Sequence, residues 1–149
     1  MLKAIRLSEE NFKKYEGGPF GAVIVRNNKI IAKGINRVIS QYDPTAHAEI
    51  IAIRNACKKL RRIWLNDCEI YTSCEPCPMC MSAIYWARIK KIYFANSRLD
   101  AEKIGFIDKK IYKELLISPE KRIIPSEQHL RSKAIKIFNK WAKVVNIIY

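Results

Sequence analysis

The fold is decided by the stretch Thr72-Ser73-Cys74-Glu75-Pro76-Cys77-Pro78-Met79-Cys80, which places two cysteines where a helix is expected to begin. Cys77 and Cys80 have the spacing Cys-x-x-Cys, and Pro78 between them suits the first position of a helix, where its missing N–H costs nothing. Cys80 is therefore expected in the first helical turn. The positive end of the helix dipole favours thiolates there, and thiolates are the form that binds zinc.

A third candidate ligand lies upstream, in the stretch Pro44-Thr45-Ala46-His47-Ala48-Glu49. His47 and Glu49 are two residues apart and open an amphipathic helix. Three protein ligands, His47, Cys77 and Cys80, leave one tetrahedral position of a zinc ion open for water, as a catalytic site needs. Glu49 lies too far round the helix to bind the metal beside His47, so it is the candidate to take a proton from that water and pass it on.

Other interpretations of the cysteines stay open on the residues alone. A Cys-x-x-Cys pair also occurs in redox motifs and in structural zinc sites. Cys74 is a candidate fourth ligand that would close the site, although the loop into Pro76 is expected to aim its side chain away. Cys57 falls in a helical apolar pattern and Cys68 at a strand start, so both are interpreted as small core hydrophobes.

Length and composition predict one cytoplasmic domain. A chain of 149 residues is long enough to bury a core without disulfides. The cysteine count of five is odd, the start Met1-Leu2-Lys3-Ala4 has no apolar signal region, and no apolar run approaches membrane length. We therefore expect a soluble cytoplasmic protein with reduced thiols and no membrane partner.

The charge of the chain has two interpretations. The formal net charge is +14, and a basic surface attracts nucleic acid through its phosphates, which would suit a tRNA substrate. The basic residues are scattered along the chain, however, and a composition rich in lysine and isoleucine gives such a charge without any partner. The sequence leaves both interpretations open.

Strands and helices alternate from Val23 to Phe94, which predicts a mixed sheet covered on both faces. The expected fold class is α/β, a three-layer α/β/α sandwich with a central mixed sheet. Both metal-bearing helix starts then meet at one end of that sheet. The expected elements are helix 2–15, strand 20–25, a turn at 27–28, strand 29–34, polar loop 37–44, helix 45–60, strand 69–72, a helix from 78, strand 91–95, a loop from 100 with a short helix 110–116, and a basic amphipathic helix 131–147.

In the stretches 43–49 and 71–80 the chain resembles the cytidine deaminase superfamily of zinc-dependent nucleobase deaminases. The signature of that superfamily is His-x-Glu followed by Pro-Cys-x-x-Cys. Within that superfamily it is similar to the small bacterial-type guanine deaminases. The histidine stretch and the zinc cysteines are shared with tRNA adenosine deaminases. Three stretches carry the resemblance to guanine deaminases: the residue sequence of 72–80, Ile84-Tyr85-Trp86-Ala87-Arg88, and Gly105-Phe106-Ile107-Asp108.

The resemblance implies zinc-dependent hydrolysis of guanine to xanthine and ammonia. By position, it implies that His47, Cys77 and Cys80 hold zinc, that Glu49 shuttles protons, that Asn36 contacts the purine, and that Asp108 helps to protonate the departing amine. Two further contacts are predicted from the residues. Phe20 is a candidate to stack on the purine, and the N–H of Ala48, in the first helical turn, is a candidate to hold a substrate carbonyl.

The resemblance also has a consequence for assembly. In bacterial-type guanine deaminases a C-terminal segment is exchanged between the protomers of a dimer, and its terminal tyrosine closes the pocket of the partner. The expected organisation is therefore one deaminase domain over 1–149, with 119–149 as a segment that is exchanged in a homodimer. Tyr149 is the last residue and matches the closing tyrosine.

Two other functions compete with guanine deamination. A tRNA wobble adenosine deaminase would share every zinc-site residue and give the positive charge a purpose. A zinc-stabilised nucleic-acid-binding module without catalysis is the second rival. Glu49 argues against that second rival, because a purely structural zinc site gains nothing from a neighbouring carboxylate.

Overall fold

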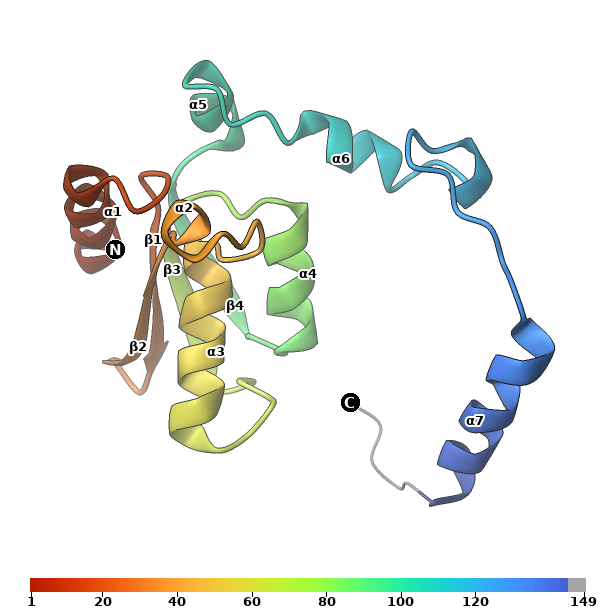
Figure 1. Cartoon of the computed structure of the whole chain (residues 1–149). Coiled ribbons are helices and arrows are strands. Elements are labelled where there is room, and N and C mark those ends of the chain that lie inside the picture. Colours follow the sequence, from red (N-terminus) through yellow and green to blue (C-terminus); the bar gives the residue numbers. More distant parts are fainter. Residues whose placement is uncertain (145–149) are drawn as a thin grey trace. The chain divides into compact units, whose positions relative to one another are not determined.

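The computed structural model describes residues 1–144. The chain divides into two compact units, Met1–Asp108 and Lys109–Tyr149, and each unit is described here by itself. The first unit contains a four-stranded sheet and the helices that cover it (Figure 1).

The sheet is mixed, with the strand order β2-β1-β3-β4. β1 pairs antiparallel with both β2 and β3, whereas β3 and β4 run parallel. The mixed sheet confirms the prediction from the sequence. Its strands are β1 (Gly21–Arg26), β2 (Lys29–Ile35), β3 (Cys68–Cys74) and β4 (Lys91–Asn96).

The turn between β1 and β2 is set by two asparagines. Asn27 and Asn28 have φ angles of 47° and 59°, in the left-handed region that asparagine tolerates better than most residues. Two consecutive residues with positive φ form the tight turn whose twist matches that of a hairpin. The predicted hairpin is therefore confirmed.

One face of the sheet is covered by α1 (Leu2–Lys14). The contact is close, because a Cβ at Gly21 would overlap the Ala4 carbonyl oxygen and lie 2.7 Å from the Ser8 nitrogen. Val23, two residues along β1, faces the same side and is 1% exposed. In Figure 1 α1 lies on the opposite side of the strands from α3 (Ala48–Leu60) and α4 (Pro78–Trp86).

The second face carries α3 (Ala48–Leu60) and α4 (Pro78–Trp86). Together with α1 they complete the three layers, so the predicted α/β/α sandwich is confirmed. The core lies between the sheet and α3 and includes small residues on the helix that let it approach closely. Its buried members are Ala22, Ile24, Ala32, Ala48, Ala52, Ile53, Ala56, Leu65, Cys68, Ile70, Ile84 and Ala87, so the interpretation of Cys68 as a core residue is confirmed.

Three local predictions differ from the structure. The expected loop 37–44 contains a short helix, α2 (Val38–Gln41). α3 begins at Ala48 instead of residue 45, because His47 has extended backbone angles and is the N-cap. Part of the expected loop from 100 is helical and belongs to α5 (Arg98–Lys103). Ser97 is its N-cap, and the Ser97 hydroxyl and the Asp100 carboxylate form a reciprocal capping box.

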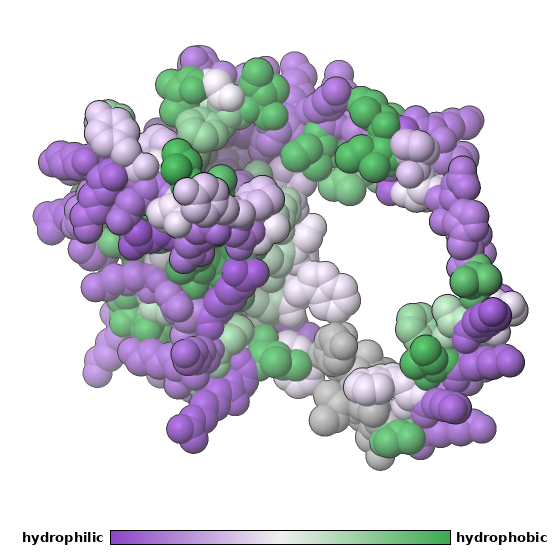
Figure 2. All heavy atoms as spheres, viewed as in Figure 1, coloured by the Kyte–Doolittle hydropathy of each residue, from purple (hydrophilic) through white to green (hydrophobic). Residues whose placement is uncertain are grey.

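The second unit contains α6 (Lys109–Glu114), a 3-10 turn (Pro119–Lys121) and α7 (Arg131–Val144). Figure 2 shows apolar side chains exposed along α6 and α7 among hydrophilic ones. The exposed apolar residues of α7 are Ile137, Phe138, Trp141 and Val144. This composition agrees with the expected amphipathic helix. Exchange of residues 119–149 in a dimer stays a prediction.

None of the helices within residues 1–144 has the length and apolar character needed to cross a lipid bilayer.

Replacing Gly34 by alanine should destabilise the fold. An alanine Cβ there would overlap the Ala48 carbonyl oxygen and lie 2.6 Å from the Ala52 nitrogen, and both of these atoms belong to the backbone of α3. We expect a loss of about 2 kcal/mol or more in the free energy of unfolding, measured by urea titration, because an overpacked contact between backbones cannot relax through side-chain rotation.

Gly18→Ala is the matched control for this substitution. Its new Cβ would meet ring carbons of Phe20, the nearest at 2.8 Å, and a ring can rotate away. A small change in stability is therefore expected for Gly18→Ala. Equal losses for the two variants would contradict the close packing of α3 on β2.

Candidate active site

Two helices begin at the same end of the sheet, and each has a candidate metal ligand as its N-cap. His47 caps α3 with φ −71° and ψ 156°, and Cys77 caps α4 with φ −65° and ψ 168°. Pro78 occupies the start of α4, as predicted, and Cys80 lies in the first turn. The orientation of helix starts therefore delivers one imidazole and two thiols to one place.

The end of β3 fixes the approach to α4. The Thr72 hydroxyl donates to the Cys74 carbonyl oxygen at 2.9 Å, and the Glu75 N–H donates to the Asn96 carbonyl oxygen of β4 at 2.8 Å. These bonds tie the first part of the loop to the sheet. Cys77 therefore enters the site from a supported backbone.

His47, Cys77 and Cys80 form a group that could hold a metal ion, with all ligand atoms within 4.8 Å of one another. The Nδ1 atom of His47 lies 3.5 Å from the sulfur of Cys77 and 3.5 Å from that of Cys80. Tetrahedral zinc, with Zn–N and Zn–S bonds of about 2.0 and 2.3 Å, would separate nitrogen and sulfur by about 3.5 Å. The residues present therefore fit zinc without rearrangement.

Hydrogen bonding shifts the pKa values of the two thiols in opposite directions. The pKa of Cys77 is lowered to about 4, chiefly by a hydrogen bond from Cys80 and also by one with His47, which together outweigh the effect of burial. The same bond to Cys77, together with burial, raises the pKa of Cys80. The pair shares a proton that zinc would displace, because zinc binds thiolates.

Glu49 lies beside this group and is 6% exposed. Its carboxylate accepts from the Thr72 hydroxyl at 3.3 Å and from the Cys80 thiol at 3.5 Å. Burial raises the pKa of Glu49, as expected for a carboxylate removed from water. Glu49 lies outside the group of metal ligands, as predicted from its place on the helix.

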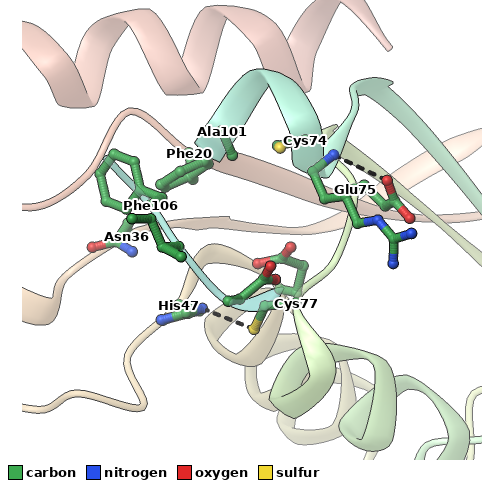
Figure 3. Close-up of a pocket in the computed structure, with 12 residues that line it drawn as sticks. Phe20, Asn36, His47, Cys74, Glu75, Cys77, Ala101 and Phe106 are labelled. Carbon is green, nitrogen blue, oxygen red and sulfur yellow. Dashed lines mark hydrogen bonds between the residues drawn. The ribbon is translucent and has the colours of Figure 1, made fainter. Parts of the chain in front are cut away.

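A cavity of about 190 Å³ opens at the ligand group (Figure 3). It belongs entirely to the first unit, and it has both apolar and titratable walls. The residues that line it are Phe20, Asn36, His47, Glu49, Cys74, Glu75, Cys77, Arg98, Ala101, Phe106, Ile107 and Asp108.

Two aromatic rings and an amide form part of the cavity wall. Phe20 and Phe106 pack edge to face, with ring centroids 4.8 Å apart and an interplanar angle of 81°. Asn36 is 4% exposed and lines the same cavity. These groups suit a flat heterocycle, which offers a face for aromatic contact and an edge for hydrogen bonds.

Asp108 is also part of the cavity wall. Burial, and then the negative charge of Cys77, raise the pKa of its carboxyl group. The structure thus places Asp108, which the sequence marked only by resemblance, in the same cavity as Glu49. Its role in proton transfer stays a prediction.

The cavity does not include every predicted residue. Ala48 is absent from its lining and packs on β2 instead, so an N–H contact to substrate stays a prediction. Tyr149 lies outside the described residues. Cys74 lines the cavity but is not in the ligand group, and its thiol donates to the Ser97 carbonyl oxygen at 3.5 Å.

Several lining residues were not singled out as contacts from the sequence. Cys74 and Glu75 belong to the cysteine stretch and Phe106 to the Gly-Phe-Ile-Asp stretch. Their closeness in sequence to predicted site residues could have indicated that they line the cavity. Arg98 and Ala101 come from α5, a helix that was not expected and that overlaps the start of the loop expected from 100. The capping pattern Ser-x-x-Asp at 97–100 could have indicated that helix.

Residues 1–96 match the family described as the cytidine and deoxycytidylate deaminase zinc-binding region. This match includes all three members of the ligand group and Glu49. The chain belongs to this deaminase family. Its zinc-binding assignment and the geometry of the ligand group agree.

This deaminase is 49% identical over 146 residues to guanine deaminase of Bacillus subtilis (strain 168), and the match covers 98% of this chain and 94% of the relative. The X-ray structure of guanine deaminase from Bacillus subtilis has a TM-score of 0.94 at 48% identity, covering 99% and 94% of the two chains. A tRNA-specific adenosine deaminase of Buchnera aphidicola is more distant, at 38% identity over 143 residues, covering 95% and 89%.

The composition of the ligand group predicts which Cys→Ser substitutions reduce the zinc content of the protein. The wild-type protein should bind about one equivalent of zinc, measured by plasma mass spectrometry after dialysis. Cys80→Ser should lose nearly all of this zinc, because a catalytic site has only three protein ligands. Cys57→Ser is the matched control, since its thiol contacts the Ile63 carbonyl oxygen at 3.7 Å and is not in the ligand group. Full zinc in Cys80→Ser would contradict the assignment.

Proposed function

We propose that this protein is a zinc-dependent hydrolase that converts guanine and water to xanthine and ammonia. The observation that carries the proposal is the buried Glu49 carboxylate beside a three-ligand zinc group, both opening into one cavity. The named relative supports guanine as the substrate, because it is 49% identical over nearly the full length of both chains.

His47, Cys77 and Cys80 would hold the zinc. When bound, the ion lowers the pKa of a coordinated water and so supplies a nucleophile at neutral pH. Glu49 takes a proton from the attacking water and delivers it to the ring nitrogen next to C2 as the carbon becomes tetrahedral. The remaining hydroxyl proton of the added water is then passed to the exocyclic amine, the C2–N bond breaks, ammonia leaves and the C2 carbonyl of xanthine forms. Because Glu49 is buried among Thr72 and Cys80, its carboxylate is held facing the site and away from competing solvent.

The other predicted residues are given roles on the cavity wall. We propose that Phe20 contacts the face of the purine, that the Asn36 amide meets its edge, and that Asp108 assists protonation of the leaving amine. Ala48, through its N–H, and Tyr149, from a partner chain, remain candidates for substrate contacts. Only Phe20, Asn36 and Asp108 are supported by their place in the cavity.

A tRNA adenosine deaminase is the second candidate function. It is favoured by the charge of +14 and by the 38% identity to the Buchnera enzyme over most of the chain. Guanine deamination ranks above it because the identity to guanine deaminase is higher, 49% against 38%, over nearly the full length of the chain. Nucleic acid is therefore the less favoured partner, and a binding module without catalysis is weaker still.

The proposed setting is the cytoplasm, as a homodimer that takes part in purine metabolism. All five cysteines are free thiols, and two of them belong to the ligand group, which supports a reducing compartment. The exposed apolar side chains of α7 support the exchange of residues 119–149 between two copies. The molar mass in light scattering checks the dimer, and one chain's mass would overturn it.

Zinc-loaded protein should release ammonia from free guanine and form xanthine, with no release from adenine, cytosine or a tRNA anticodon stem-loop. Glu49→Gln should reduce kcat about 10²- to 10⁴-fold while zinc content and melting temperature stay unchanged, because the amide cannot transfer the proton. Glu69→Gln is the matched control; Glu69 pairs with Lys90 at 3.4 Å and does not line the cavity.

The outcomes of this assay separate the candidates. Turnover of the stem-loop alone would replace guanine deamination by tRNA editing. Full activity of Glu49→Gln on guanine would remove Glu49 from the mechanism.

A further inference from the structure

The helix α1, which does not line the cavity, carries a buried amide. Asn11 is fully buried, and its Nδ2 group donates to the Gly18 carbonyl oxygen at 2.7 Å and to the Asn36 carbonyl oxygen at 2.9 Å. The opposite orientation of the amide would set its oxygen against these two carbonyl oxygens, so the orientation follows from the hydrogen-bond network. Asn11 therefore joins two separate backbone segments.

Asn36 is held by its side chain as well. Its Oδ1 atom accepts from the Gly18 N–H and from the Val38 N–H, both at 3.2 Å. Gly17 closes the space on another side, because a Cβ there would overlap Asn36 Oδ1 and lie 2.6 Å from the Asn36 carbonyl oxygen. The main chain and the side chain of Asn36 are thus both fixed by the connection between α1 and β1.

This network decides which atom of Asn36 faces a ligand. Two N–H groups occupy Oδ1, so Nδ2 is the part of the amide left to bond with a molecule in the cavity that Asn36 lines. In Figure 3 the amide nitrogen of Asn36 lies on the side of His47 and Cys77, and the oxygen on the other side. A fixed donor favours an acceptor edge of the ligand, such as a carbonyl oxygen or ring nitrogen, over an amino group.

We propose that Asn11 is a positioning residue, which sets the donor orientation of Asn36 and through it the preference of the cavity for a heterocycle with an acceptor edge. The inference rests on the proposed function in one respect, that Asn36 meets the substrate. The burial of Asn11 supports a specific role, because its Oδ1 has no hydrogen-bond partner among residues 1–144. A leucine of similar size would avoid that unfavourable burial, but it could not hold the two carbonyl groups.

The first test does not depend on activity. In Asn11→Leu, amide hydrogen exchange followed by NMR should become about tenfold or more faster at Gly18 and Val38, whose N–H groups bond to Asn36 Oδ1, while exchange in the interior of α3 stays unchanged. Asn55→Leu is the matched control, because Asn55 Nδ2 also donates to a backbone carbonyl, that of Lys33, at 3.0 Å and lies outside the cavity lining. Unchanged exchange at Gly18 and Val38 in Asn11→Leu would overturn the proposal.

The second test is a double-mutant cycle on guanine turnover. Asn11→Leu should lower kcat/KM about tenfold in the wild-type background and less than twofold in the Asn36→Ala background, because a residue that acts through Asn36 has little left to act on. Equal losses in both backgrounds would assign Asn11 a merely structural role and overturn the proposal.

The two tests also separate the failure of this inference from the failure of the proposed function. If the wild-type protein does not turn over guanine, the proposed function fails, and hydrogen exchange still decides whether Asn11 positions Asn36. If guanine is turned over and exchange in Asn11→Leu is unchanged, the proposed function stands and Asn11 has no positioning role.

Discussion

The structure depends on the convergence of one imidazole and two thiols from two helix starts. His47 Nδ1 lies 3.5 Å from the sulfur atoms of both Cys77 and Cys80, although the histidine and the cysteines are about 30 residues apart in sequence. Neither helix can move along the sheet without separating these atoms. The same constraint fixes Glu49, since it is in the first turn of α3 and accepts a hydrogen bond from Cys80. The candidate metal ligands and the Glu49 carboxylate are thus positioned by one contact between helices.

The two faces of the sheet contribute different properties to the cavity. The α3 and α4 side supplies the ligand group and Glu49, and the backbone of Ala48, in the first turn of α3, packs closely on Gly34 of β2. The α1 side supplies support for the binding wall, through the bonds of Asn11 to the backbone near Asn36. The three-layer arrangement therefore allows the candidate metal group and another part of the cavity wall to be supported by separate elements.

The cysteines of the metal group could be predicted because they are close in sequence. Other residues in or near the cavity could not be predicted, because no local pattern links them to it. Cys77, Pro78 and Cys80 have a fixed relation within one helical turn, so their placement follows from the sequence. The capping pattern at 97–100 indicates that α5 forms, but only the fold shows that this helix brings Arg98 and Ala101 to the cavity. Asn11 is harder still, since a polar residue in an amphipathic helix is normally interpreted as exposed, and only the fold reveals two carbonyl groups above it.

The coordination of bound zinc tests the central claim most directly. X-ray absorption spectroscopy of the zinc-loaded protein should give two sulfur ligands at about 2.3 Å and two nitrogen or oxygen ligands at about 2.0 Å, which correspond to Cys77, Cys80, His47 and one exchangeable water. The spectrum should be unchanged in Cys74→Ser. Three sulfur ligands, with one lost in Cys74→Ser, would show a closed structural site and contradict the account.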